Sequence, residues 1–214
     1  MSPHDPLGSE RRRLREPAGP DERLIDAIVY YGLAQVLILT VLMLWFVFQS
    51  TVHRDSHVIG SIVVLVLLPT LIGLRRRELI GDREWPRIET VTLGIGGGYR
   101  LLLGRAVFLS AVVGLGTYGA GVAGMVADGP VLPAVVAAGL VAGCVAVFPA
   151  VSGTDWRARR GRFALYAAAL VGGLYFGAPF DASVGFHSAV VLYPTLVALG
   201  VLDLAIGGGA GTGR

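Results

Sequence analysis

Six long apolar stretches constrain the fold of this chain of 214 residues more than any other feature. They cover residues 27–48, 58–74, 106–127, 131–151, 163–180 and 184–206. A helix needs about 20 apolar residues to cross a bilayer, with a usual range of about 17–25. Strands of a membrane barrel would alternate apolar and polar residues, which runs such as IVVLVLLPTLIGL do not. The pattern predicts an all-α fold, a polytopic membrane bundle of six transmembrane helices.

Composition excludes several other classes of protein. Only 15% of the residues are charged and 54% are hydrophobic, whereas a soluble domain carries about 25% charged residues. The single cysteine, Cys144, excludes an intrachain disulfide and a Cys-x-x-Cys zinc site built by this chain alone. The chain is basic, but no run of arginines is interleaved with aromatic residues, so we expect no nucleic-acid partner.

The arginines predict which way the bundle lies in the membrane. If residues 1–24 are cytoplasmic, 17 of the 18 basic residues lie on the inner side and only Arg54 lies outside. This distribution satisfies the positive-inside rule and predicts an even number of spans with both termini in the cytoplasm. A five-span alternative would place one arginine cluster outside. We therefore expect a multi-pass protein of the cell membrane whose arginines also contact anionic headgroups.

The domain organisation follows from the same pattern. Residues 1–24 are polar and Arg-rich and predict a flexible cytoplasmic tail, and residues 207–214 form a Gly-rich tail. Residues 25–206 form the six-helix transmembrane domain. The first apolar stretch is longer than the core of a signal peptide and lacks a cleavage site after it, so we expect it to stay as the first span.

Residues 75–105 form the one sizeable inner connection and predict an interfacial segment. It ends in GIGGGYR, after which a third helix is expected to begin at Tyr99 and Arg100, with Arg105 extending toward the headgroups. Backbone N–H groups of such a loop can hold a phosphate beside a cation, although a flexible elbow explains the glycines as well. The candidate headgroup or phosphate contacts are Arg75, Arg76, Arg77, Gly96, Gly97, Gly98 and Arg100.

Small residues in the third and fourth stretches predict close helix packing. The spelling GLGTYGAG matches a dinucleotide-binding pattern, but a strand and an aqueous loop are lacking there. Spans associate instead through small residues that let their backbones approach. The predicted packing residues are Gly114, Gly116, Ala120 and Gly121 in one helix, and Ala134, Ala138 and Gly139 in the next.

The outer side of the predicted bundle gathers histidines and aspartates. The polar residues there are His53, Asp55, His57, Asp181 and His187. If the first helix continues through its loop, His53 and His57 share a face, and a third ligand would complete a zinc or copper site. A proton-linked or cation-attracting role is a second interpretation. The third is that wet outer loops simply hold polar residues.

Two classes of function remain open, and no enzyme signature is present in the sequence. The scarcity of charge within the spans, where only His187 and Asp203 lie, favours a non-catalytic scaffold or accessory membrane subunit. Such a protein would have a dry core and a partner-binding surface at residues 75–105, or would form a homo-oligomer. A small transporter- or channel-like module is the alternative, and a membrane-embedded enzyme is a weaker one. The transporter predicts a polar path lined by Gln35, Tyr118, Tyr166, Tyr175 and Tyr193.

Overall fold

The computed structural model describes residues 23–50, 54–80, 98–153, 155–180 and 188–206, and no strand occurs among them. The prediction of an all-α fold is confirmed for this part of the chain. The helices are α2 (Leu24–Asp26), the π-helix η1 (Ala27–Leu33), α3 (Ala34–Leu39), α4 (Val41–Phe48), α5 (Arg54–Arg76), α6 (Gly98–Val126), α7 (Val131–Val151), α8 (Trp156–Gly177) and α9 (Ala189–Ile206).

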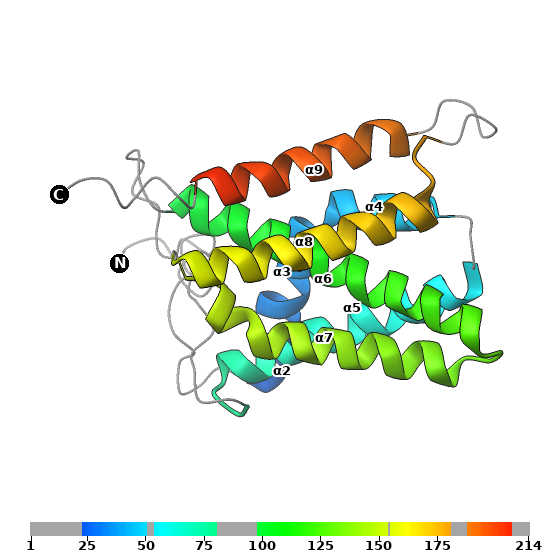
Figure 1. Ribbon diagram of the computed structural model, residues 1–214. Coiled ribbons are helices and arrows are strands. Elements are labelled where there is room, and N and C mark those ends of the chain that lie inside the picture. The colour runs from blue at the N-terminus through cyan, green and yellow to red at the C-terminus, as the bar shows by residue number, and fades with distance from the viewer. Residues whose placement is uncertain (1–22, 51–53, 81–97, 154, 181–187, 207–214) are drawn as a thin grey trace, which may run out of the picture.

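Helix α6 is the central element of a bundle in which α4 to α9 run side by side (Figure 1). It packs against α5, α7, α8, α9 and both halves of the first helical segment, and it is the most buried of the long apolar helices. It carries large buried residues such as Phe108 and Leu109, which are 0% exposed. The core therefore lies around α6, and the other helices cover it.

Among the residues that the structure describes, three helices are long and apolar enough to cross a membrane, namely α5, α7 and α6 from Leu102 onward. The segment from α2 to α4 would be a fourth if it is a single span. Helix α9 is apolar but short by the same test, and α8 begins with four arginines within its first seven residues.

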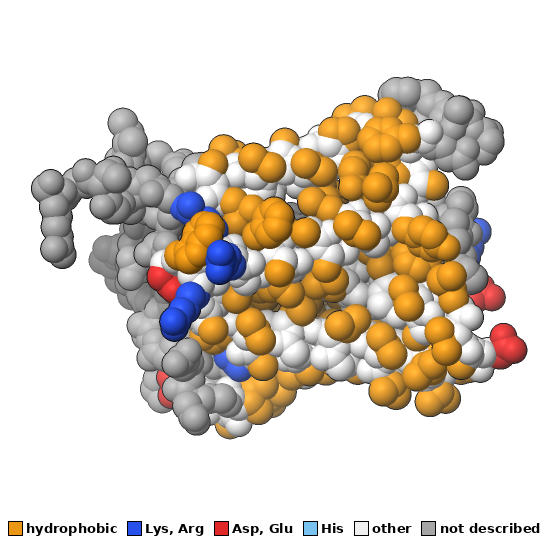
Figure 2. Space-filling view, viewed as in Figure 1, with side chains coloured by type: hydrophobic (Ala, Val, Ile, Leu, Met, Phe, Trp, Pro, Cys, Tyr) orange, Lys and Arg blue, Asp and Glu red, His pale blue; other side chains and the backbone are white. Residues whose placement is uncertain are grey.

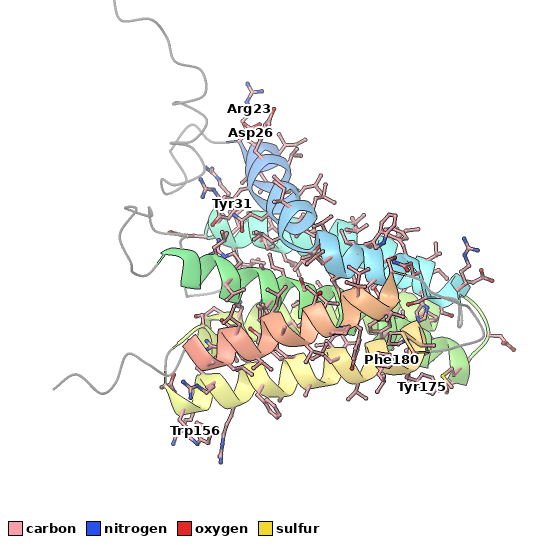
Figure 3. The ribbon with its side chains drawn as sticks, turned by 90° about the horizontal axis from the view of Figure 1, so that it is seen from above. Arg23, Asp26, Tyr31, Trp156, Tyr175 and Phe180 are labelled. Carbon is pink, nitrogen blue, oxygen red and sulfur yellow. The ribbon has the colours of Figure 1, made fainter. Side chains whose placement is uncertain are left out.

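The first apolar stretch, predicted as one continuous span, is instead broken at Thr40. The helical axis turns by 64° between Leu24–Leu39 and Val41–Phe48. Thr40 is fully buried, and its Oγ1 donates to the carbonyl oxygen of Val36 at 2.6 Å. A threonine hydroxyl that bonds to the carbonyl four residues earlier competes with the helix ladder and favours a bend. Figure 3 shows the part before Thr40 leaving the bundle and the part after it running along the bundle.

Glycines set how closely the helices approach one another. A Cβ at Gly32 in η1 would lie 3.0 Å from the carbonyl carbon of Pro69. A Cβ at Gly73 would lie 2.9 Å from the backbone of Ile28. The segment before the bend is thus fixed to α5 by direct backbone contact, which larger residues would prevent.

The predicted packing glycines of α6 face several helices rather than one. A Cβ at Gly116 would be 2.5 Å from Val64 of α5 and 3.3 Å from Val141 of α7. Gly114 faces α4 and α8, and Gly121 faces α5 and α8. Ala120 is fully buried against α5.

On the partner helix α7, the predicted packing residues lie further from α6. Ala134 and Ala138 are half-buried. Gly139, predicted to face α6, lies on the exposed side of α7 with nothing within 4 Å of its Cβ position. Gly119, which the prediction omitted, faces Leu140 of α7 instead. The spacing of small residues along α6 showed which of them share a face, but it did not show that other helices pack against several faces of α6.

We predict that Gly60→Ala destabilises the protein, because the added methyl would lie 2.6 Å from Cβ of Ala120 and 3.1 Å from Cα of Thr117. Overpacking of this kind costs about 1–3 kcal/mol. Thermal unfolding of the purified protein in detergent would show a lowered Tm. Gly139→Ala is the matched control and should leave the Tm unchanged, since that position is open. Equal Tm values for the two variants would contradict this packing.

Candidate functional site

A buried ion pair joins α8 to α9 at the end of the bundle where α8 begins. Nε of Arg162 lies 3.3 Å from Oδ2 of Asp203, and the two side chains are 8% and 5% exposed. The hydroxyl of Tyr166, one turn further along α8, donates to the same Oδ2 at 3.0 Å. Asp203 therefore has two partners, a cation and a phenol, in a place that water scarcely reaches.

The same pair extends to α6 and α7. The Nη1 of Arg162 donates to the carbonyl oxygens of Val151 and Gly153, each at 2.9 Å, at the C-terminal end of α7. On the other side, a Cβ at Gly104 of α6 would lie 2.9 Å from Oδ1 of Asp203. Four helices thus meet at one carboxylate and one guanidinium.

A second buried arginine joins α6 to the segment before the bend. Arg105, predicted to extend toward the headgroups, is only 3% exposed. Its Nη1 donates to Oε1 of Gln35 at 3.1 Å and to the hydroxyl of Tyr31 at 3.4 Å. The guanidinium of Arg76 lies 4.1 Å from the centre of the Tyr31 ring, a cation–π contact. Two arginines from α5 and α6 therefore meet around one tyrosine.

Between these two clusters lies an apolar cavity of about 50 Å³, which we call the Thr40 groove. Residues on both sides of the bend form one wall, α9 forms the other, and α6 and α8 form the floor. Its lining residues include Leu39, Leu42, Ala106, Tyr166, Leu199 and Gly200. Its few polar groups include the hydroxyls of Tyr166 and Tyr193, which are occupied by Asp203 and by the carbonyl oxygen of Leu170. The groove can therefore accept hydrocarbon more readily than a polar solute.

The opposite end of the bundle carries aromatic and amide contacts. Nε1 of Trp45 donates to Oγ of Ser188 at 3.0 Å, and that hydroxyl donates to Oε1 of Gln49 at 2.8 Å. His57 is 3% exposed, and its ring lies edge-on to the rings of Tyr118 and Phe176 at centroid distances of 5.8 and 4.8 Å. These contacts connect α4 to α9, and α5 to α6 and α8.

The predicted outer cluster is only partly covered by the described residues. His53, Asp181 and His187 lie outside them. Asp55 is exposed and His57 is buried, both near the start of α5. The first helical segment ends at Phe48, as its predicted bounds of 27–48 have it, so the condition under which His53 and His57 would share a face of that helix is not met. No three candidate ligands come together among the described residues, and the zinc or copper site stays a prediction.

The predicted headgroup contacts are divided in the same way. Arg75 and Arg76 lie in the last turn of α5 and are half-buried, as is Arg77 just after it. Gly96 and Gly97 lie outside the described residues. Gly98 is the first residue of α6 and Arg100 lies in its first turn. The side chain of Arg100 is not among those that the structure describes.

Sequence reasoning missed the arginine clusters, although the chain held one signal for them. Arg162 and Tyr166 are four residues apart on α8, so they share a face. Asp203 lies three residues before the end of α9, at a similar depth in an antiparallel helix. Because Arg162 and Asp203 lie at a similar depth, they are indicated as a pair. Counting the charges of each span separately treats Asp203 as an isolated residue at a helix end.

Comparison with known proteins places the chain in a family. A model of the family described as "Domain of unknown function (DUF8215)" matches residues 22–154, more than half of the chain. The chain belongs to this family. No curated protein and no solved structure matches it. In this DUF8215 protein the matched residues include Gln35 and Arg105, whereas Arg162, Tyr166 and Asp203 lie beyond them.

We predict that Asp203→Ala strongly destabilises the protein, because Arg162 would remain buried without its carboxylate. Removing one partner of a buried ion pair costs about 3–5 kcal/mol. Combining Arg162→Met with Asp203→Leu should recover part of the loss, because no unpaired charge is then left. The measurement is the Tm of each purified variant, with Asp128→Ala, at an exposed aspartate, as the control. A Tm for Asp203→Ala equal to that of the control would show that the pair does not stabilise the fold.

Proposed function

We propose that this DUF8215 protein crosses the cell membrane six times, with both ends in the cytoplasm, and acts as a non-catalytic scaffold or accessory membrane subunit. The six spans are the broken segment from α2 to α4 and the helices α5, α6, α7, α8 and α9. Three of these spans are the long apolar helices α5, α6 and α7. The proposal adds the bent segment and the two C-terminal helices as the other three.

The distribution of apolar and charged side chains supports a membrane location. Large hydrophobic side chains point outward along the whole bundle, among them Ile38, Val66, Val131 and Val171 at 72%, 65%, 73% and 66% exposed. Figure 2 shows that hydrophobic side chains cover much of one face of the bundle between the two ends of the helices. A soluble protein rarely exposes so large an apolar surface, whereas lipid tails would cover it favourably.

The two ends of the bundle differ in charge, which supports the orientation. The described charged residues at one end are nine arginines and four acidic residues, namely Arg23, Arg75, Arg76, Arg77, Arg105, Arg157, Arg159, Arg160 and Arg162 with Asp26, Glu78, Asp155 and Asp203. At the other end the described charged residues are Arg54, Asp55 and Asp128. Cytoplasmic ends of membrane proteins carry the excess of arginine.

Helices α8 and α9 fit this topology despite the arginines and the short length. The arginines of α8 lie in its first two turns, and the part from Phe163 to Gly177 would extend about 22 Å at 1.5 Å per residue. Helix α9 returns antiparallel to α8 (Figure 1) and packs against it, α6 and α4. Its residue Asp203 faces Arg162 and not lipid.

We predict that single cysteines will report this topology, in a Cys144→Ala background that leaves the chain without other thiols. Asp55→Cys and Asp128→Cys should react with a membrane-impermeant maleimide in intact cells. Glu78→Cys and Asp155→Cys should react only after the membrane is permeabilised. All four positions are exposed in the structure. Labelling of Asp155→Cys in intact cells would contradict the orientation.

The internal contacts support a structural role over transport. Of the five residues expected along a polar path, only Tyr166 and Tyr193 line the groove. Gln35 is bonded to Arg105, Tyr118 is buried against aromatic rings, and Tyr175 is 60% exposed on the outside. The buried charges join helices to one another, which is what a rigid scaffold needs.

One observation favours the transporter-like alternative. Broken helices often border the substrate site of transporters, and here the bend at Thr40 borders the Thr40 groove, with Asp203 behind Tyr166. Solute flux into vesicles containing the purified protein, abolished by Tyr166→Phe, would favour this alternative over the scaffold. A membrane-embedded enzyme has no comparable support in the described residues.

We predict that a partner protein contacts the inner segment that begins after α5. A photo-crosslinking amino acid at Leu79, which is 60% exposed beyond the last turn of α5, should give a discrete protein adduct in cells. The same group at Val66, 65% exposed in the middle of α5, should give none, because lipid surrounds it. Adducts at both positions or at neither would contradict a partner surface at residues 75–105.

A further inference from the structure

We propose that the Thr40 groove binds part of one acyl chain of an anionic phospholipid whose headgroup lies at the arginine-rich end of the bundle. This inference rests on the membrane location and orientation proposed above.

The groove lies beside the bend at Thr40. Because the axis turns by 64° there, α3 diverges from the bundle axis that α4 follows (Figure 3). Helix α9 packs against α4, and the space beside the bend is lined by Leu39, Leu42, Leu199 and Gly200.

The size and depth of the groove fit a hydrocarbon chain. A volume of about 50 Å³ accepts a few methylene groups, whereas a helix of about 10 Å diameter would not enter it. Tyr166 lies four residues beyond Arg162, about 6 Å along α8, and Gly173 of the lining lies about 16 Å along it. Half of a hydrocarbon core is about 15 Å thick, so the groove lies at the depth of the acyl chains in the arginine-side leaflet.

The charges at the end of the groove are complementary to an anionic headgroup. Leu39 lines the groove, and Gln35, one turn toward the arginine-rich end, holds Arg105. Beyond it, Tyr31 contacts both Arg105 and Arg76. Arg105 is covered, whereas Arg76 is only half-buried. An amphiphile lying along this wall would therefore meet apolar side chains first and the guanidinium of Arg76 next, and guanidinium binds phosphate oxygens well.

The test is a titration of the delipidated, full-length protein with palmitoyl-oleoyl phosphatidylglycerol, followed by native mass spectrometry. Palmitoyl-oleoyl phosphatidylcholine, with the same chains, is the headgroup control. Gly200→Leu should fill the groove, because a Cβ there meets only Tyr166, at 3.8 Å. Gly139→Leu adds the same side chain to the exposed face of α7 and leaves the groove open.

We expect one phosphatidylglycerol molecule on the wild type and on Gly139→Leu, and at least a tenfold loss of affinity in Gly200→Leu. Gly200→Ala is a milder change for the case in which Gly200→Leu does not fold. It should show a smaller loss of affinity for phosphatidylglycerol. Equal binding to Gly200→Leu and the wild type, or to both lipids, would overturn the proposal. A dimer of the lipid-free wild type that Gly200→Leu disrupts would also overturn it, because a second copy of the chain would then occupy the groove. Cysteine labelling tests the topology separately. If the labelling supports six spans but the protein binds no phosphatidylglycerol, only the lipid-binding proposal is contradicted.

Discussion

The contact between Arg162 and Asp203 is the interaction on which the arrangement of the C-terminal helices depends. Lipid tails give apolar helices little reason to prefer one another, so a membrane bundle relies on polar contacts and on close backbone approach. The carboxylate joins α8 to α9, the guanidinium reaches the end of α7, and Gly104 lets α6 approach the same point. An isolated charge at this position would be costly in a bilayer, whereas here each charge faces the opposite one at 3.3 Å.

The N-terminal part of the bundle depends on a different device. Gly32 and Gly73 let η1 and α5 touch backbone to backbone. Thr40 then turns the chain, and Arg105 fixes the part before the bend to α6 through Gln35 and Tyr31. The bend would be a defect in a purely structural helix. Here it borders an apolar groove, whose Tyr166 is bonded to Asp203 and whose Leu39 lies one turn from Gln35, the partner of Arg105.

The family assignment and the structure divide the molecule differently. The DUF8215 match covers α2 to α7, which includes the bend at Thr40, Gln35 and Arg105. The ion-paired helices α8 and α9 lie beyond it, yet they supply one wall and part of the floor of the Thr40 groove. The groove is therefore a property of the whole bundle, and the matched residues alone would leave it without its α9 wall.

The sequence by itself determined that the described chain is helical, because apolar runs of this length in a chain with so few charges favour helices that satisfy their own backbone groups. It also located α7 at residues 131–151 and the start of α6 near Tyr99. Only the tertiary structure decided that the first stretch bends at Thr40, that Gly139 faces outward, and that Arg105 and Arg162 turn inward. The reason is that hydropathy is a sum over neighbouring residues, whereas a bend, a buried arginine and a groove depend on which side chains of other helices lie opposite. Pairing Arg162 with Asp203 requires two helices to be placed at the same depth, and no single segment contains that information.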